Sequence, residues 1–408
     1  MSHKWLAVVV SVLMASASLA AQSPAVDPIT EWSVTASRLA ASTRMPPLRT
    51  PISLALLHLA MHAAVTAVED GREHAVLRPA RSRPASAVAA AVEAGYQVLM
   101  AEFPPEQVAI RATYERLFDA ELDARAKAHG ISIGAAVAHG LLRQRASDGR
   151  NAIVPYTPGT GAGVWVPTPP AFLPENTAFL ARVTPFTMNS PSRVRPNGPP
   201  RLRSKRWADD FNEVKRRGSR DSAERRPDET ATALFWEPLA GTVWPATIRR
   251  LAQEQALDLS HSARFQAAAF MAFADALIAC WDAKYHFNFW RPVTAIRQGD
   301  TDDNDRTEAD PVWEPLSITP NFPEYASGHT CATAAVAHTI ENYFDRQVPI
   351  PARNVVTGEE RVYQRADDVV DEVVEARMLL GLHFRSADED GADIGQRVAS
   401  RVRRRFLR

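Results

Sequence analysis

The chain contains 408 residues, of which 46% are hydrophobic, and its 47 Lys and Arg balance 47 Asp and Glu. This length suffices for a large hydrophobic core or for two lobes. Because the formal net charge is zero, no general attraction to nucleic acid or to a membrane surface is predicted. The two cysteines do not form a CxxC pair, which excludes the usual zinc-finger spacings.

The N-terminal sequence MSHKWLAVVVSVLMASASLAAQSPA is typical of a secretory signal peptide. Lys4 precedes an apolar run from Trp5 to Met14, and small residues at 18–20 resemble a cleavage site. The apolar run is too short for a stable membrane span, and no later stretch has about 18 uninterrupted apolar residues. We therefore predict a signal peptide over residues 1–20, a mature chain without a membrane span, and a periplasmic or secreted location.

Residues 52–69 carry apolar side chains at steps of three and four, which predicts an amphipathic helix. His58 and His62 share one face of this helix, four residues apart. Neither a third ligand nor the glutamate of an HExxH motif accompanies them, so we interpret both as core or interface residues rather than as metal ligands.

More helices are predicted on both sides of a proline-rich segment. Residues 84–128 indicate two helices that break near Pro104 and Pro105. Residues 155–203 contain too many Pro and Gly for a regular helix, and their interspersed aromatic residues argue against disorder. We therefore predict an ordered, extended segment that wraps one lobe.

The remaining pattern is helical, and strand-like alternation is weak throughout, so the predicted fold class is all-α. Small residues at Gly130, Gly134 and Ala138 predict a close contact between helices. We expect two helical halves, residues 21–203 with the wrapping segment and residues 204–408. The helices expected in the second half cover 205–217, 228–237, 244–257, 261–286, 326–345, 365–382 and 388–406.

The first polar motif is KYHFNFWRP at 284–292, near the end of a long predicted helix. Lys284 and Arg291 lie seven residues apart, about two helical turns, so they would point the same way if the helix continued through both. Pro292 would end that helix soon afterwards. Two cations without acidic neighbours on the same face suggest an anion site. The alternative is that both side chains extend to solvent across an aromatic helix.

The second motif, Ser327-Gly328-His329, lies where an extended stretch changes to an Ala- and Val-rich helix. Ser is a good N-cap and Gly eases a turn, so the triplet can be a simple capping turn. Alternatively, it binds an oxyanion, because the first N–H groups of a helix are unpaired and its N-terminus is the positive end of the dipole.

The third motif, RMLLGLHFR at 377–385, places Arg377 and His383 six residues apart in a predicted apolar helix, with Gly381 between them. A buried arginine needs a counter-charge, and no acid stands three or four residues from Arg377. The three motifs together supply three cations, a hydroxyl, a glycine amide and two histidines. This set suits a tetrahedral oxyanion, because guanidinium groups can bind pairs of oxygens and a histidine can attack or coordinate the central atom.

The combined pattern KxxxxxxRP, SGH and RxxxxxH resembles the vanadium-dependent haloperoxidases and the related type 2 phosphatidate and acid phosphatases. The flanking sequences CWDAKYHFNFWRPVTAIR, FPEYASGHTCAT and GLHFR are similar to the bacterial haloperoxidase-like branch, as are ALLHLAMHAAV, GVWVPTPPAFLP and DFNEVK in the first half. The resemblance covers most of the mature chain. It implies a pair of helical bundles, with an anion pocket at the end of the second bundle.

The resemblance also implies a role for each motif residue. His383 would coordinate vanadium, and His329 would be the acid–base residue. Bound vanadate would activate hydrogen peroxide toward halide, and the hypohalous acid formed would halogenate a small organic acceptor. The oxygens of vanadate, or of phosphate in its place, would be bound by Lys284, Arg291, Ser327, Gly328 and Arg377.

Four further residues are assigned to the surroundings of the site. Phe322 matches a position that is often aromatic in fungal-type chloroperoxidases, where it would line the halide pocket; alternatively, it anchors the start of the helix. Trp281 would support Lys284, and Asp275 or Asp282 would contact the site residues from behind.

The third motif departs from the family pattern. Ala376 stands where a serine usually precedes the arginine, and Ala387 stands where an aspartate commonly orients the second histidine. Asp388, Asp390 or a backbone carbonyl is expected to orient His383 instead.

The sequence leaves several alternatives open. The same residues would serve an acid phosphatase, with a phosphohistidine at His383 and leaving-group protonation by His329, or a non-catalytic exported protein that binds an oxyanion. The long aromatic and proline-rich first half favours the haloperoxidase, since the compact phosphatases have little use for it. Cys280 and Cys331 either form a disulfide or remain free thiols, and the assembly state is open, with a homodimer as one option.

Overall fold

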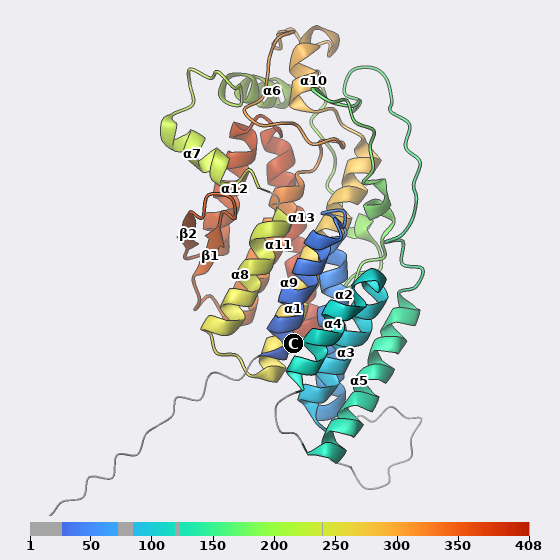
Figure 1. Ribbon diagram of the computed structural model, residues 1–408. Helices are drawn as coiled ribbons and strands as arrows, with labels where there is room; N and C mark the ends of the chain where they lie inside the picture. Colours follow the sequence, from blue (N-terminus) through green and yellow to red (C-terminus); the bar gives the residue numbers. More distant parts are fainter. Residues whose placement is uncertain (1–26, 72–84, 119–122, 239, 408) are drawn as a thin grey trace, which may run out of the picture.

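The computed structural model describes residues 27–71, 85–118, 123–238 and 240–407, and the structural statements below refer to these residues. The predicted signal peptide lies outside them. The fold is mainly helical (Figure 1), which confirms the predicted all-α class. Two short strands, β1 (Ile350–Arg353) and β2 (Glu360–Tyr363), pair antiparallel at the edge of the second bundle.

The first bundle confirms two packing predictions. A 3-10 turn at Pro104–Glu106 separates two helices where the proline pair predicted a break. A Cβ atom at Gly130 would lie only 2.3 Å from the Ser86 carbonyl oxygen, and one at Gly134 would lie 2.3 Å from that of Ala90. The glycines therefore allow the backbones of two helices to touch. The helices of this bundle are α1 (Pro28–Ser42), α2 (Thr50–Glu69), α3 (Ala87–Glu102), α4 (Gln107–Leu117) and α5 (Ala124–Gln144).

Of the two histidines of α2, His58 is fully buried in the core and His62 is half-buried. His58 stacks on Phe270 with 4.3 Å between ring centroids, and His62 packs against Phe406 at 4.7 Å. The described residues contain no group of three or more side chains placed to hold a metal ion. Both histidines thus have the packing role predicted for them.

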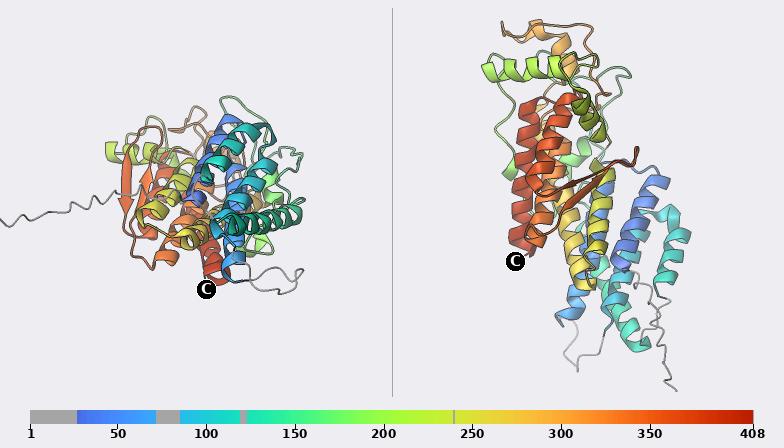
Figure 2. Two further views of the ribbon diagram at one scale, coloured as in Figure 1. Left: turned by 60° about the horizontal axis from the view of Figure 1, so that its bottom comes forward. Right: turned by 90° about the vertical axis from the view of Figure 1, so that its left-hand side faces the viewer.

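The second bundle is built around α9 (Leu259–Phe287), which is buried along most of its length. This helix contacts α2 of the first bundle and α11 of the second, so it joins the two halves. Figure 2 shows α12 and α13 towards one end of the molecule and the helices of the first bundle towards the other. The other helices of the second half are α6 (Lys205–Arg217), α7 (Pro227–Phe235), α8 (Ala240–Glu254), α10 (Pro292–Arg297), α11 (Gly328–Phe344), α12 (Ala366–Leu379) and α13 (Arg385–Val402).

Two described helices, α2 and α9, are long and apolar enough to cross a membrane by length and composition alone. Within their most apolar windows, 67% of α2 and 94% of α9 are buried inside the protein. Such extensive burial is typical of helices in the core of a protein.

The proline-rich segment is ordered and is held along α9 by acidic side chains of that helix. The Asp275 carboxylate accepts hydrogen bonds from the backbone N–H groups of Phe186 (2.6 Å) and Thr187 (2.7 Å). Asp282 pairs with Arg195 at 2.7 Å. The prediction that Asp275 or Asp282 contacts the site residues is therefore wrong, because both carboxylates are used to hold the wrapping segment.

α9 ends within one residue of its predicted end at 286, whereas α12 ends three residues before its predicted end at 382. α9 stops at Phe287, where Asn288 takes a left-handed conformation with φ 50°, so Lys284 and Arg291 do not share one helix. α12 stops at Leu379, and Gly381 turns the chain with φ +74°. A Cβ atom there would lie 2.5 Å from the Gly218 carbonyl oxygen. Glycine is suited to this turn, and it places His383 in the connection between α12 and α13 rather than in a helix.

Candidate active site

Three chain segments bring the predicted site residues together beneath α6, at the upper end of the second bundle in Figure 1. Arg291 follows the C-terminal end of α9, and its NH1 lies 3.2 Å from His383 Nε2 and donates to the Leu382 carbonyl at 3.0 Å. A disulfide between Cys280 and Cys331 joins α9 to the first turns of α11, which begins just after Ser327. The helix ends and the disulfide thus fix the three motifs at one place.

Lys284 is fully buried and is held from the segment that precedes α11. Its Nζ donates to the carbonyls of Pro323 (3.0 Å) and Glu324 (2.8 Å). The ammonium lies 5.4 Å from the ring centroid of Trp281 and 5.3 Å from that of Phe322. Trp281 therefore contacts Lys284 as predicted. Burial, followed by the charge of Arg291, lowers the pKa of Lys284 well below its usual value, and a bound anion would oppose this shift.

The two arginines are buried without a carboxylate partner. Arg291 Nε donates to the Phe322 carbonyl at 2.9 Å, and Arg377 NH1 donates to that of Trp236 at 3.1 Å. Arg291 NH2 and Arg377 Nε have no hydrogen-bond partner, and neither guanidinium forms a salt bridge within the described chain. Burial lowers the pKa of Arg291 to about 9 and that of Arg377 to about 10. Buried donors of this kind need an acceptor, and an oxyanion supplies one.

The Ser327 hydroxyl does not act as a helix cap. Ser327 occupies the N-cap position of α11, but its side chain makes no capping hydrogen bond, and its buried Oγ has no partner of good geometry. The hydroxyl lies close enough to the Asp388 carboxyl to favour its charged form. A Cβ atom at Gly328 would lie 2.9 Å from the Trp281 ring, so glycine lets the helix start approach this ring. The simple capping interpretation therefore does not describe this hydroxyl.

His329 lies in the first turn of α11 and is partly exposed. Its Nε2 is 3.0 Å from the Pro238 carbonyl oxygen. A carbonyl can only accept, so Nε2 carries the proton and Nδ1 is the basic nitrogen. The surrounding protein, followed by the charge of Arg377, lowers the pKa of His329 well below its usual value. The lowered pKa favours the neutral imidazole, in which Nδ1 carries the lone pair.

His383 is 2% exposed and lies between a cation and an acid. Its Nε2 faces Arg291, and its Nδ1 is 2.8 Å from Glu324 Oε1. Glu324 was missed by the sequence reasoning. The available signal was that it is the single acid between Glu314 and Glu341, within the segment that contains the Ser327 motif.

The aspartates that were expected to orient His383 have other neighbours. Asp390 accepts from the Tyr325 hydroxyl at 2.6 Å. Asp388 is fully buried near Ser327 and Arg377, but neither of its oxygens forms a hydrogen bond. The expectation that Asp388, Asp390 or a backbone carbonyl orients this ring is therefore wrong, since Glu324 contacts Nδ1.

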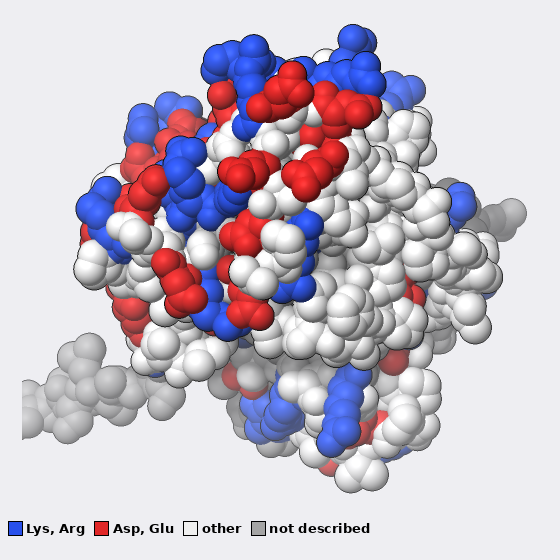
Figure 3. All heavy atoms as spheres, turned by 90° about the horizontal axis from the view of Figure 1, so that it is seen from above, with Lys and Arg blue, Asp and Glu red and all other residues white. Residues whose placement is uncertain are grey.

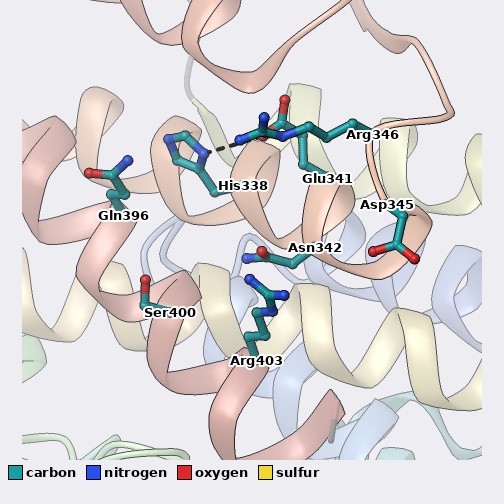
Figure 4. Close-up of a pocket in the computed structure, with 8 residues that line it drawn as sticks. All are labelled: His338, Glu341, Asn342, Asp345, Arg346, Gln396, Ser400 and Arg403. Atoms are coloured by element: carbon teal, nitrogen blue, oxygen red, sulfur yellow. Dashed lines mark ion pairs between the residues drawn. The ribbon is translucent and has the colours of Figure 1, made fainter.

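A separate polar hollow of about 360 Å³ lies at the other end of α11 and against the end of α13 (Figure 4). His338 and Arg346 both face Glu341 there, each at 3.7 Å. None of the predicted site residues lines this hollow. Above the site, charged side chains of both signs alternate over one half of the surface (Figure 3). No field of a single sign covers this face.

The chemistry of the buried donors fits an oxyanion such as vanadate or phosphate. Three unpartnered donor atoms lie at the site, namely Arg291 NH2, Arg377 Nε and Ser327 Oγ. Lys284 adds a buried ammonium, and the first amides of α11 add a helix N-terminus. His383 Nε2 provides a lone pair for a central atom.

Comparison with known proteins agrees with this geometry. Residues 264–408 match the family of the VCPO second helical-bundle domain. Vanadium chloroperoxidase from Curvularia inaequalis is 31% identical over 154 residues, which are 31% of this chain and 25% of that protein. Residues 264–408 are therefore similar to the second helical bundle of vanadium chloroperoxidase. The chain spans about a quarter of the length of the curated relative that it matches.

Solved structures of vanadium haloperoxidase-like proteins share the fold over most of the chain. The first bacterial vanadium-dependent iodoperoxidase has a TM-score of 0.76 at 21% identity, covering 92% of this chain and 95% of that one. A holo-type bacterial vanadium-dependent chloroperoxidase has a TM-score of 0.64 at 18% identity, covering 88% and 92%. The fold therefore extends through both helical bundles.

Proposed function

We propose that this protein is a vanadate-dependent haloperoxidase, which converts hydrogen peroxide, halide and a proton into hypohalous acid and water. One observation carries the proposal: among the described residues, three buried cations without carboxylate partners lie near enough to His383 for their charges to lower its pKa, and Arg291 NH1 is 3.2 Å from its Nε2. A structural role for these cations would require counter-charges within the fold. The likeness to vanadium chloroperoxidase supports the choice of vanadate over other oxyanions.

Vanadate, when bound, would supply Lewis-acid activation of peroxide. Arg291, Arg377 and Lys284 would hold its oxygens and withdraw negative charge, together with the Ser327 hydroxyl and the Gly328 amide. His383 Nε2 would hold the central atom.

His329 would manage the protons. With Nε2 fixed on the Pro238 carbonyl, Nδ1 would accept a proton from incoming peroxide and return it to the water that leaves. His329 is partly exposed, whereas His383 is buried. Phe322 would contribute an apolar wall close to Lys284 and Arg291 for the halide, and the hypohalous acid would halogenate a small organic acceptor.

Export belongs to the same proposal. The signal-like residues 1–20 and the disulfide between Cys280 and Cys331 support a periplasmic or secreted enzyme, since disulfides persist in oxidising compartments. Detection of the mature chain, cleaved after about residue 20, in a periplasmic or culture fraction would test this point.

The deciding experiment uses purified protein, freed of metal and incubated with orthovanadate. Peroxide-dependent oxidation of iodide and bromide is expected only with vanadate, and His383→Ala is expected to abolish it. His338→Ala, in the polar hollow at the far end of α11, is the matched control and should retain activity. Hydrolysis of an aryl phosphate that vanadate inhibits, without halide oxidation, would instead make the protein a phosphatase with His383 as nucleophile.

A further inference from the structure

Glu324 is the acid that contacts a histidine of the pocket. Its side chain is 0% exposed, and Oε1 lies 2.8 Å from His383 Nδ1 and accepts from the Phe384 amide at 3.1 Å. The backbone of Glu324 is fixed as well. Its N–H donates to the Phe289 carbonyl at 2.9 Å, and its carbonyl accepts from Lys284.

The neighbours of His383 define its tautomer. Arg291 NH1 is a donor and lies 3.2 Å from Nε2, so Nε2 must accept. The proton of the neutral ring is then on Nδ1, where Glu324 Oε1 receives it. Without an acceptor at Nδ1, the ring would bury an unpaired N–H, and the opposite tautomer, which removes the lone pair from Nε2, would become competitive.

We propose that Glu324 is a positioning residue, which holds His383 in the Nδ1–H tautomer and so keeps Nε2 unprotonated and available to the central atom of the bound oxyanion. The inference rests on the proposed function, because it concerns the same pocket. Glu324 acts through His383 and does not touch the oxyanion. It comes from the segment before α11, whereas Asp388 and Asp390, which are nearer to His383 in sequence, do not contact the ring.

Two measurements test the role of Glu324 independently of halide oxidation. Nitrogen-15 NMR of histidine-labelled protein reports the tautomer of His383, with the signals assigned by comparison with His383→Ala. Titration of the metal-free protein with orthovanadate, and separately with inorganic phosphate, reports the affinity of the pocket. The variants are Glu324→Ala, which removes the acceptor, and Glu324→Gln, whose amide oxygen can still accept both N–H groups. Asp390→Asn is the control.

The expected result separates the variants. Glu324→Ala should move His383 towards the Nε2–H tautomer and weaken orthovanadate binding by about 10–100-fold, the range found for partners of metal-bound histidines. Glu324→Gln should keep the Nδ1–H tautomer and lose less affinity than the alanine variant. Asp390→Asn should match the wild type in both measurements.

Two outcomes would overturn the inference: an alanine variant with unchanged tautomer and affinity, or a glutamine variant as impaired as the alanine variant. If Glu324→Ala does not fold, the glutamine variant decides, because positioning requires its tautomer to be unchanged. A wild-type protein that binds orthovanadate but oxidises no halide would disprove the proposed function and leave the role of Glu324 intact.

Discussion

Two regions of the molecule bury arginines beside acids, and they differ in how the charges are paired. Where the first bundle meets the wrapping segment, Arg145 donates to Asp148 at 2.9 Å and to the carbonyls of Pro185 and Thr184. Arg150 pairs there with Asp148 at 3.0 Å and with Glu102 at 3.1 Å. At the site, by contrast, the hydrogen bonds of Arg291 and Arg377 within the described residues go to carbonyls and a histidine, and each arginine retains an unpartnered nitrogen.

The difference separates a cluster that stabilises the fold from one that can bind a ligand. The closed cluster consists of Arg145, Arg150, Asp148 and Glu102, and the open cluster consists of Arg291 and Arg377. Burial penalises the charged form of Arg145 as it does that of Arg377, but Asp148 directly offsets the penalty for Arg145. At the site, Glu324 and Asp388 lie nearby and reduce the excess positive charge without contacting either guanidinium. The open donors are thus free to bind an external oxyanion, which takes the place that Asp148 has in the closed cluster.

Breaking the closed cluster should have the largest effect on stability. Arg145→Met leaves two carbonyls without donors and takes one cation from Asp148, which should cost about 3–5 kcal/mol of unfolding free energy. Denaturant unfolding would measure it. Arg116→Met is the control, because Arg116 forms an exposed ion pair with Glu31 and should change stability by less than about 1 kcal/mol. Equal losses in both variants would contradict the proposed closed cluster.

Unpaired charges at the site do not stabilise the fold there, so another interaction must. The disulfide between Cys280 and Cys331 provides such stabilisation next to the site. The bond closes a separation of 51 residues, for which loop entropy gives about 4 kcal/mol of stabilisation. The double variant Cys280→Ala/Cys331→Ala should lose stability on this scale and bind orthovanadate more weakly. Reductant should reproduce the loss in the wild type and have no effect on the double variant. Unchanged vanadate affinity in the double variant would show that the bond does not support the pocket.

Removing an arginine of the site should lower activity without lowering stability, which is the opposite of the effect expected for Arg145→Met. Arg377→Met takes a donor from the pocket, and loss of one such donor typically lowers the rate by about 10²–10³-fold. Stability should stay the same or rise, because a buried charge without a contacting partner is removed. Halide oxidation and unfolding, measured on the same preparation, test both expectations. If Arg377→Met lost as much unfolding free energy as Arg145→Met, Arg377 would serve mainly to stabilise the fold.

The sequence predicted the fold class and the residues of the pocket well. It predicted the backbone conformation around those residues less well. Spacing could show that Lys284, Arg291, Arg377 and His383 belong to cationic motifs. It could not show that Asn288 takes a left-handed conformation after α9 or that Gly381 turns the chain before His383. Those helix ends depend on a left-handed residue and on a close backbone approach, and both are decided by tertiary packing.

The acids around the site were the hardest part to predict. Asp275 and Asp282 are near Lys284 in sequence, yet they hold the wrapping segment. Glu324 comes from another segment, 59 residues before His383, and reaches the ring only because the chain folds back there. A partner of this kind follows from three-dimensional proximity and leaves no periodic pattern in the sequence.

The smallest effect is expected at Asp210 on α6, which lies near the candidate site and forms no ion pair within the described residues. It is 7% exposed, its Oδ2 has no hydrogen-bond partner, and its charge acts on Glu324. Burial raises its pKa from 3.8 to about 6, against the opposing effects of Ser386 and Arg206. The folded protein therefore keeps this proton to higher pH than the unfolded chain does, and stability present at low pH is lost as the pH rises through about 6.

Asp210→Asn cannot titrate, so it should lack this loss and be more stable than the wild type above the folded pKa, by roughly 1–3 kcal/mol. Unfolding free energies measured from below the unfolded pKa to neutral pH would show a shallower slope for the variant. Asp209→Asn, on the same helix but in an exposed pair with Lys205, should follow the wild-type slope. Parallel curves for Asp210→Asn and wild type would mean that a counter-charge already neutralises Asp210. The contrast between paired charges in the first bundle and unpaired charges at the site would then not extend to α6.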